Sequence, residues 1–163
     1  MTKFIQAALA SSVLVASVMG ATAARADTAT ADARANILKQ VSVESDGSAL
    51  DFGTIVTGTA ASTVSVSAGG MSCGAGLVCS GTTSAAGFDV TGTAGETVSV
   101  ASDPSVTLTS GTNTMTANIV ASVSTLTLTG GAGSFNVGGL LNVGANQADG
   151  AYEGSFNVTV NYN

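Results

Sequence analysis

Polar and apolar residues alternate with a period of two along most of this chain, and this pattern constrains the fold more than any other feature. It is clearest in the last fourteen residues, 150–163, and runs to the chain end. The positions on one face of this stretch are Tyr152, Gly154, Phe156, Val158, Val160 and Tyr162. Such alternation predicts a strand with one buried face. Chain ends usually fray, so we expect this strand to be held by pairing and its last aromatic ring to be covered.

The same pattern recurs in short segments separated by glycine-rich turns. We predict further strands at 36–44, 49–56, 62–68, 85–92, 96–102, 105–111, 113–121, 125–130 and 134–143. The one candidate helix, residues 28–39, continues into an alternating stretch and is therefore weak. About ten short strands at roughly ten-residue spacing predict an all-β antiparallel sandwich or barrel.

The first 26 residues have the pattern of a secretory signal. A basic start at Lys3 precedes an apolar run, and Ala24-Arg25-Ala26 forms an A-x-A cleavage site before Asp27. The apolar run is shorter than the ~20 residues of a good membrane span, so the alternative of an uncleaved anchor is weaker. We therefore expect export, removal of 1–26, an extension at 27–35 and one domain at 36–163.

Charge and residue types exclude several functions. After Ala26 the chain keeps two basic residues, Arg34 and Lys39, and all ten acidic residues. This balance repels phosphate backbones, so we expect no nucleic-acid partner. The chain has no histidine, the commonest general base, so we interpret it as a non-enzyme without a cofactor.

Carboxylates offer the remaining chemical alternatives. Asp149 and Glu153 could flank a sugar as in glycoside hydrolysis, and Asp46 or Asp149 could bind calcium. The sequence has no D-x-D-x-D loop, and few aromatic residues would contact a sugar. We therefore interpret these acids as turn and edge residues, and expect neither a catalytic nor a metal site.

The two cysteines, Cys73 and Cys79, are separated by five residues. Export into an oxidising compartment favours a disulfide, which we expect to clip a hairpin locally. A redox or metal role is the alternative, but no histidine or further cysteine completes a zinc site.

The segment after the cleavage site alternates as well. Ala29, Ala31, Ala33 and Ala35 share one face of an extended 27–35, which would reach about 30 Å. A row of small side chains suits a narrow groove, and β-strand addition uses such a segment. The alternative is a flexible terminus.

These features resemble two families. A final alternating strand with a penultimate aromatic, here Tyr162, and a glycine fourteen residues from the end, here Gly150, resembles subunits of chaperone–usher pili of Gram-negative bacteria. The wider pattern, with "ANILKQVSV", "LDFGTIV", "CSG", "FNVGG" and "GANQADGAYEGSFNVTVNY", resembles a bacterial family of secreted β-domains without an assigned function. The early "LDFGT" is similar to spore-coat-U-like subunits of archaic pili.

The pilus resemblance implies an immunoglobulin-like sandwich that lacks one strand. A periplasmic chaperone would fill its groove before an outer-membrane usher, and the N-terminal extension of the next subunit would fill it in the fibre. By position, 27–35 would be the donor strand and Tyr152–Tyr162 the groove edge. The chaperone would grip the carboxylate of Asn163. The local disulfide and the alanine-rich donor depart from many such subunits.

We therefore expect a structural subunit of an extracellular pilus, in a head-to-tail polymer of like subunits. The alternative is a self-contained secreted or surface sandwich that binds a carbohydrate or protein ligand. The sequence leaves open whether the last strand pairs within one chain or between chains.

Overall fold

The computed structural model describes residues 26–163, in which twelve strands and no helix are assigned. In chain order the strands are β1 (Ser42–Ser45), β2 (Thr54–Val56), β3 (Ser62–Ser67), β4 (Gly70–Cys73), β5 (Val78–Ser80), β6 (Ala86–Thr91), β7 (Thr97–Ser102), β8 (Ser105–Ser110), β9 (Asn113–Ala121), β10 (Thr125–Thr127), β11 (Ala132–Val143) and β12 (Val158–Tyr162). The described part of the chain contains no candidate for a membrane-spanning helix.

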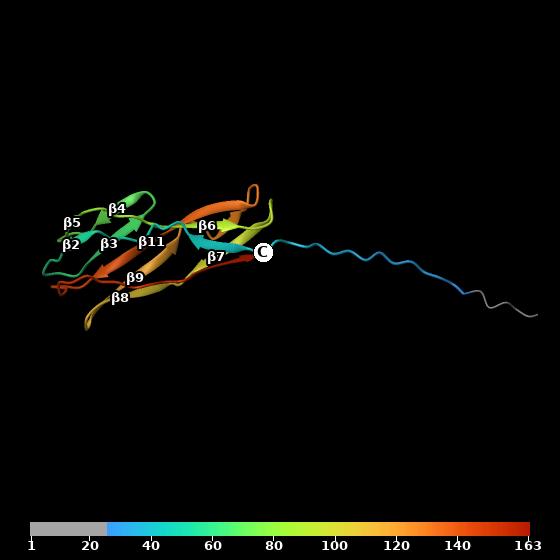
Figure 1. The fold of residues 1–163 in the computed structure, drawn as a ribbon. Coiled ribbons are helices and arrows are strands. Elements are labelled where there is room, and N and C mark those ends of the chain that lie inside the picture. The colour runs from blue at the N-terminus through green and yellow to red at the C-terminus, as the bar shows by residue number, and fades with distance from the viewer. Residues whose placement is uncertain (1–25) are drawn as a thin grey trace, which may run out of the picture. The chain divides into compact units, whose positions relative to one another are not determined.

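The strands form two main sheets and a small ribbon (Figure 1). The larger sheet has the order β1–β6–β11–β3–β4, and the β8–β9 hairpin joins it because β9 also pairs with β11. The smaller sheet has the order β10–β7–β12, and β2 pairs with β5 in the ribbon. All pairings are antiparallel. The predicted all-β, immunoglobulin-like antiparallel sandwich is confirmed.

Valine dominates the core between the sheets, as expected where β-branched residues pack on a pleated surface. The largest fully buried side chains are Leu128, Val64, Val90, Val98 and Val137. Phe88 of β6 stacks on Phe135 of β11, with ring centroids 5.5 Å apart, and Phe156 meets Phe88 edge-on at 6.3 Å. The C-terminal stretch therefore contributes a ring to the core.

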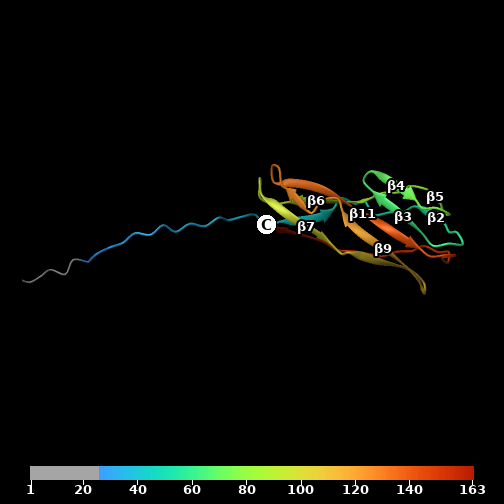
Figure 2. The same cartoon turned by 180° about the vertical axis from the view of Figure 1, so that it is seen from behind.

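The chain enters and leaves the domain at the same end. The Tyr162 hydroxyl donates a hydrogen bond to the Lys39 carbonyl oxygen at 2.7 Å, so the residues before β1 lie beside the end of β12. The ribbon and β4 lie at the opposite end (Figures 1 and 2). The C-terminal stretch is antiparallel to β8 at the Thr109–Glu153 bridge. Four successive antiparallel pairings connect β1 to β8 through β6, β11 and β9, so β1 and β8 are parallel. β1 and β12 therefore run in opposite directions.

The predicted disulfide between Cys73 and Cys79 is present. Cys73 ends β4, which pairs with β3, and Cys79 lies in β5, which pairs with β2. Since β4 and β5 belong to different sheets, the expected clip on a hairpin is wrong. The bridge instead ties the β2–β5 ribbon to the larger sheet.

Replacing both cysteines with serine should lower the free energy of unfolding by about 2 kcal/mol, the chain-entropy value for so short a loop. Urea unfolding of the oxidised wild-type and double-serine proteins measures it. Wild-type protein under reducing conditions is the matched control and should lose a similar amount. An unchanged free energy in both would contradict a structural role for the bridge.

The strand boundaries differ most from the prediction in the following three places. The first strand begins at Ser42 rather than residue 36, because no strand pairs with 36–41. The predicted 49–56 strand is reduced to β2 and one bridge, Asp51–Ser84. The final strand begins at Val158, and only the Glu153 bridge precedes it.

The remaining domain predictions concern the N-terminal region. The predicted secretory signal lies outside the described residues apart from Ala26. The described residues fall into two units that divide between Ala35 and Asn36. Residues 26–35 carry no assigned helix or strand, and within them Arg34 forms an ion pair with Asp32 at 3.3 Å.

Candidate strand-binding cleft and open edge

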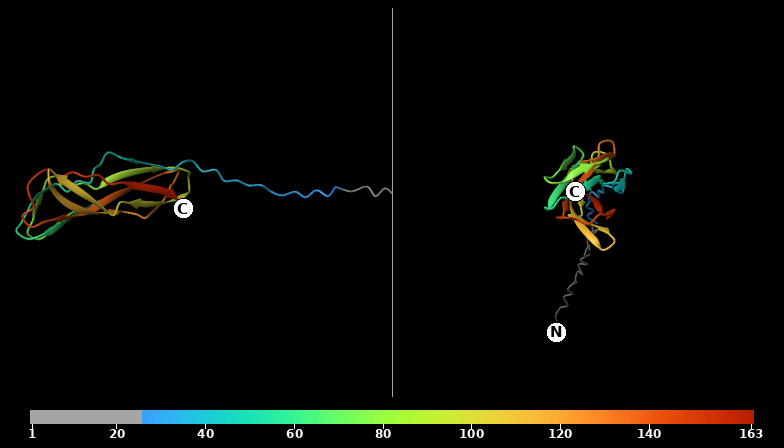
Figure 3. Two further views of the ribbon diagram at one scale, coloured as in Figure 1. Left: turned by 90° about the horizontal axis from the view of Figure 1, so that it is seen from below. Right: turned by 90° about the vertical axis from the view of Figure 1, so that its left-hand side faces the viewer.

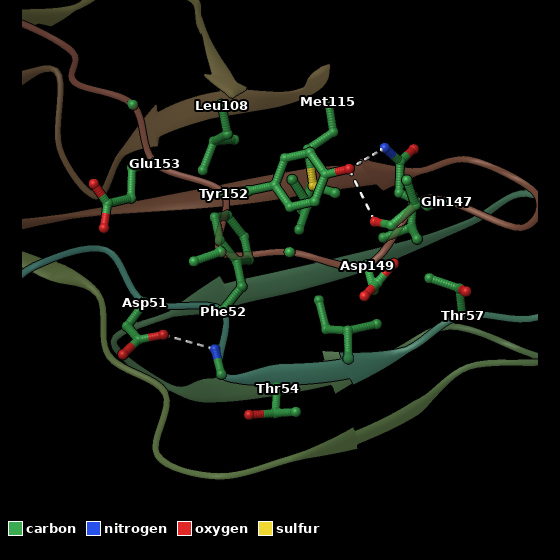
Figure 4. A pocket seen from close by; sticks show the side chains of 18 of the residues that line it. Asp51, Phe52, Thr54, Thr57, Leu108, Met115, Gln147, Asp149, Tyr152 and Glu153 are labelled. Atoms are coloured by element: carbon green, nitrogen blue, oxygen red, sulfur yellow. Dashed lines mark hydrogen bonds between the residues drawn. The ribbon is translucent and has the colours of Figure 1, made fainter. Parts of the chain in front are cut away.

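A cleft of about 1040 Å³ lies at the end of the domain that carries the β2–β5 ribbon. Its walls are residues 49–57 and residues 147–154. Its floor is apolar and is formed by Leu108, Met115, Leu141 and Val143. In Figure 4 the side chains of Phe52, Leu108, Met115 and Tyr152 point into the cleft. This cleft therefore has an apolar floor between two walls that are far apart in sequence and carry polar residues, among them Asp51, Asp149 and Glu153.

The motif "LDFGT" builds the first wall. The Asp51 carboxylate accepts the Gly53 N–H at 2.7 Å, which closes a local turn. Gly53 has φ +73°, and a Cβ there would lie 2.7 Å from the Ser80 carbonyl oxygen, so glycine is required. Phe52, 8% exposed, packs over Gly139 of β11. This explains why an aspartate, an aromatic residue and a glycine occur in this order.

The second wall belongs to the C-terminal stretch. Glu153 and Thr109 exchange both backbone hydrogen bonds, at 2.9 and 3.1 Å. A Cβ on Gly154 would lie 2.6 Å from the Thr107 carbonyl oxygen, so glycine allows the chain to approach β8 closely. Further on, the Asp103 carboxylate accepts the Asn157 N–H at 2.7 Å. These contacts hold residues 153–157 against β8 and β7 before β12 begins.

One side of the C-terminal stretch has no partner strand. β12 is the last strand of its sheet. Asn163 donates to Thr97 O and Asn157 accepts from Asp103 N, and bonded residues alternate along an antiparallel ladder. The backbone groups facing away from β7 are therefore those of Val158, Val160 and Tyr162. We call this side of residues 152–162 the open edge. The stretch itself is the red segment that ends at the C-terminus in Figure 3.

The open edge continues into the cleft. Because the backbone of Glu153 bonds to Thr109, the N–H and C=O of Tyr152 and Gly154 point the other way. On the first wall Asp51 bonds to Ser84 in the same manner, which directs the backbone of Phe52 toward the cleft. Within residues 26–163 no hydrogen bond satisfies these backbone groups of Phe52, Tyr152 and Gly154. The cleft is thus bordered by two stretches with free backbone donors and acceptors.

Two tyrosines fix the two ends of the open edge. The Tyr152 hydroxyl donates to Ala148 O at 2.9 Å and accepts from Gln147 Nε2 at 2.8 Å. The Tyr162 hydroxyl donates to Lys39 O and accepts from Thr93 N–H at 2.8 Å. Tyr162 therefore joins the end of β12 to the start of the domain, which accounts for an aromatic ring at the penultimate position.

Tyr162→Phe should lower the free energy of unfolding by about 1 kcal/mol, because one hydroxyl serves two backbone groups and one of these hydrogen bonds is partly buried. Chemical denaturation measures the change. Tyr152→Phe is the control at the other end, and it should cost less because Gln147 keeps a second acceptor, Thr114 O. A Tyr162→Phe protein as stable as wild type would contradict this role of the hydroxyl.

The sequence-predicted residues are distributed as follows. Gly150 and Tyr152 line the cleft, whereas Phe156 packs in the core. Val158, Val160 and Tyr162 turn inward from β12, and Asn163 pairs with Thr97. The alanines of the candidate donor strand lie in residues 26–35, which the structure describes as a separate unit.

Asp149 and Glu153 both line the cleft. The backbone of Glu153 serves the bridge to Thr109. Asp46 instead accepts the Ser48 N–H at 2.7 Å in a turn. No group of three or more His, Cys, Asp or Glu side chains that could hold a metal ion occurs in the described part of the chain.

Sequence reasoning missed most of the apolar residues of the cleft, among them Phe52, Leu108 and Met115. Phe52, Leu108 and Met115 belong to segments that were predicted as strands without a functional role. Phe52 and Leu108 alternate with polar residues as ordinary core residues do, so the pattern alone gives no sign that they border a cavity. The motif "LDFGT" was the available signal, because it combines a turn-forming pair with an aromatic residue.

Comparisons with known proteins add a family and no activity. A family model described as "Domain of unknown function (DUF4402)" matches residues 40–162. The matched region contains both walls of the cleft and the open edge, and it excludes residues 27–35. Neither the curated proteins nor the solved structures contain a significant match.

Proposed function

Because the chain belongs to the DUF4402 family, whose description assigns no activity, we propose a function from the geometry: the protein is a structural subunit of an extracellular pilus. Subunits join by β-strand addition. The open edge and the cleft of one copy receive the N-terminal segment 27–35 of another copy. Main-chain hydrogen bonds supply affinity, and alternate side chains supply the fit.

The open edge is the observation that supports this most strongly. An unpaired strand edge invites association, and proteins usually protect it with charge, proline or closure. Residues 152–162 contain one charged residue, Glu153, and no proline. The same stretch turns Val158, Val160 and Tyr162 toward the core, so a strand added there would cover core side chains as well.

The donor fits the edge in length and side-chain size. Nine extended residues reach about 30 Å, and the eleven residues 152–162 offer about 35 Å. The alanines at 29, 31, 33 and 35 present only small side chains to the open edge. A contact between an N-terminal segment and a different surface of the next copy is heterologous, and such contacts build a filament when their rotation does not close into a ring.

In this role the chain is exported through the periplasm and serves no catalysis. A periplasmic chaperone that supplies a temporary strand, and an outer-membrane usher, are the proposed assembly partners. A carbohydrate or protein ligand in the cleft is the second candidate, favoured by the Gln147, Asp149 and Tyr152 side chains in one wall. We prefer the strand because the free backbone groups continue beyond the cleft along β12.

Light scattering during size-exclusion chromatography tests the proposal on the mature chain, residues 27–163. We expect oligomers whose mass rises with concentration, and a shift to shorter species when a synthetic 27–35 peptide is added in excess. A peptide of the same composition with the alanines moved off one face is the control. A chain that stays monomeric at all concentrations and binds neither peptide would contradict strand addition.

A further inference from the structure

Ile37 is the most exposed large apolar residue in residues 26–163, with 86% of its surface accessible to solvent. Nothing described so far accounts for this exposure. Two residues later the chain is fixed, because Lys39 N–H donates to Thr93 Oγ1 at 2.7 Å and Lys39 O accepts from Tyr162. In an extended chain Ile37 shares a face with Ala35 and the alanines before it. From Ala29 to Ile37 it is therefore the one large side chain on this face.

The direction of the domain decides where Ile37 would meet a second copy. The chain enters the domain at the Tyr162 end, whereas the cleft lies at the ribbon end. If successive copies point the same way, a segment that extends away from the entry end of one copy reaches the cleft end of the next. The residue nearest its own domain, Ile37, then lies at the cleft, and Ala29 lies deep along β12.

We propose that Ile37 of one copy is the anchor that fills the cleft of the next copy, between Phe52, Leu108, Met115 and Tyr152. This inference rests on the proposed function and deepens it, because it extends the donor segment to 29–37 and fixes its direction. The donor runs antiparallel to the C-terminal stretch. From Ile37 to Ala29 the extended chain spans about 26 Å, which fits within the open edge.

Side-chain sizes agree with this direction. The cleft has room for a large side chain above its apolar floor of Leu108, Met115, Leu141 and Val143. Along β12 the donor offers only alanines, which need no such cavity. The opposite direction would place Ile37 beside the end of β12 and leave the cleft to Ala29.

The first test compares Ile37→Asp with Asn36→Asp in the mature chain. The two variants add the same charge one residue apart, on opposite faces of the extended segment, and residue 37 is exposed, so folding is not at issue. We expect Ile37→Asp to weaken association at least tenfold, in line with the loss of one buried isoleucine, and Asn36→Asp to match wild type. If wild type assembles and the Ile37→Asp protein assembles equally well, this inference is wrong while the proposed function stands.

The second test determines the direction in which the donor segment lies along the next copy. A photoreactive benzoylphenylalanine at position 37 is mixed with heavy-isotope-labelled wild-type chain, and cross-links between copies are mapped by mass spectrometry. We expect links to Leu108, Met115 or Tyr152. Links to Val158–Tyr162 would overturn the antiparallel arrangement. If the wild-type chain itself remains monomeric, the proposed function fails, and the inference fails with it.

Discussion

Replacing Ala31 with aspartate is expected to abolish assembly of the mature chain while leaving the domain as stable as in wild type. In the proposed complex the Ala31 side chain faces the apolar groove of another copy, where a carboxylate would be desolvated without a partner. Such burial costs several kcal/mol, enough to weaken association more than a hundredfold. Light scattering measures the mass, and thermal unfolding measures the domain.

Thr30→Asp is the matched control for this change. Residue 30 precedes residue 31 and lies on the opposite face of an extended segment, so the added charge is the same and only its direction differs. It should assemble as wild type does. If both variants lose assembly equally, the added charge and not its position is the cause. If both assemble as wild type does, the segment does not bind through its alanine face.

Phe52→Ala is expected to lower the free energy of unfolding by about 3 kcal/mol, the lower end for a buried phenylalanine. Phe52 holds the first wall of the cleft over Gly139. Truncation leaves a cavity and frees the wall, so assembly should fail even where the domain is folded. Urea unfolding and light scattering at low temperature measure the two effects.

Val56→Ala is the control for Phe52→Ala. Val56 lies in the same wall but is 58% exposed, and its truncation should change stability by less than about 0.5 kcal/mol. An equal loss of unfolding free energy at both positions would show that Phe52 does not hold the wall. A folded Phe52→Ala protein that assembles normally would show that the cleft takes no part in association.

Much of the fold could be predicted from the sequence because its strands expose one face and bury the other. The alternation places Val158, Val160 and Tyr162 inward, as observed. The strands β4 and β5 were missed because the loop that carries the cysteines shows no alternation long enough to read. The disulfide could be predicted from spacing and export, but its sheet-joining position depends on pairings with β2 and β3 that lie far along the chain.

The candidate site could be predicted only in part. Both the final strand and the alanine row are continuous in sequence, so their patterns are visible. The cleft depends on long-range geometry: Phe52 meets Gly139, and Gly154 approaches Thr107. The role we propose for Ile37 required knowing that the domain leaves it exposed, since the same residue in an alternating segment otherwise predicts burial.

Hydrogen exchange along the open edge tests the central claim most directly. The N–H groups of Val158, Val160 and Tyr162 face away from β7, whereas those of Thr159 and Asn161 pair with it. Comparing assembled wild type with the Ala31→Asp protein, we predict slow exchange at 158, 160 and 162 only in the assembly, and slow exchange at 159 and 161 in both. Assembled protein in which 158, 160 and 162 still exchange rapidly would contradict strand addition at this edge.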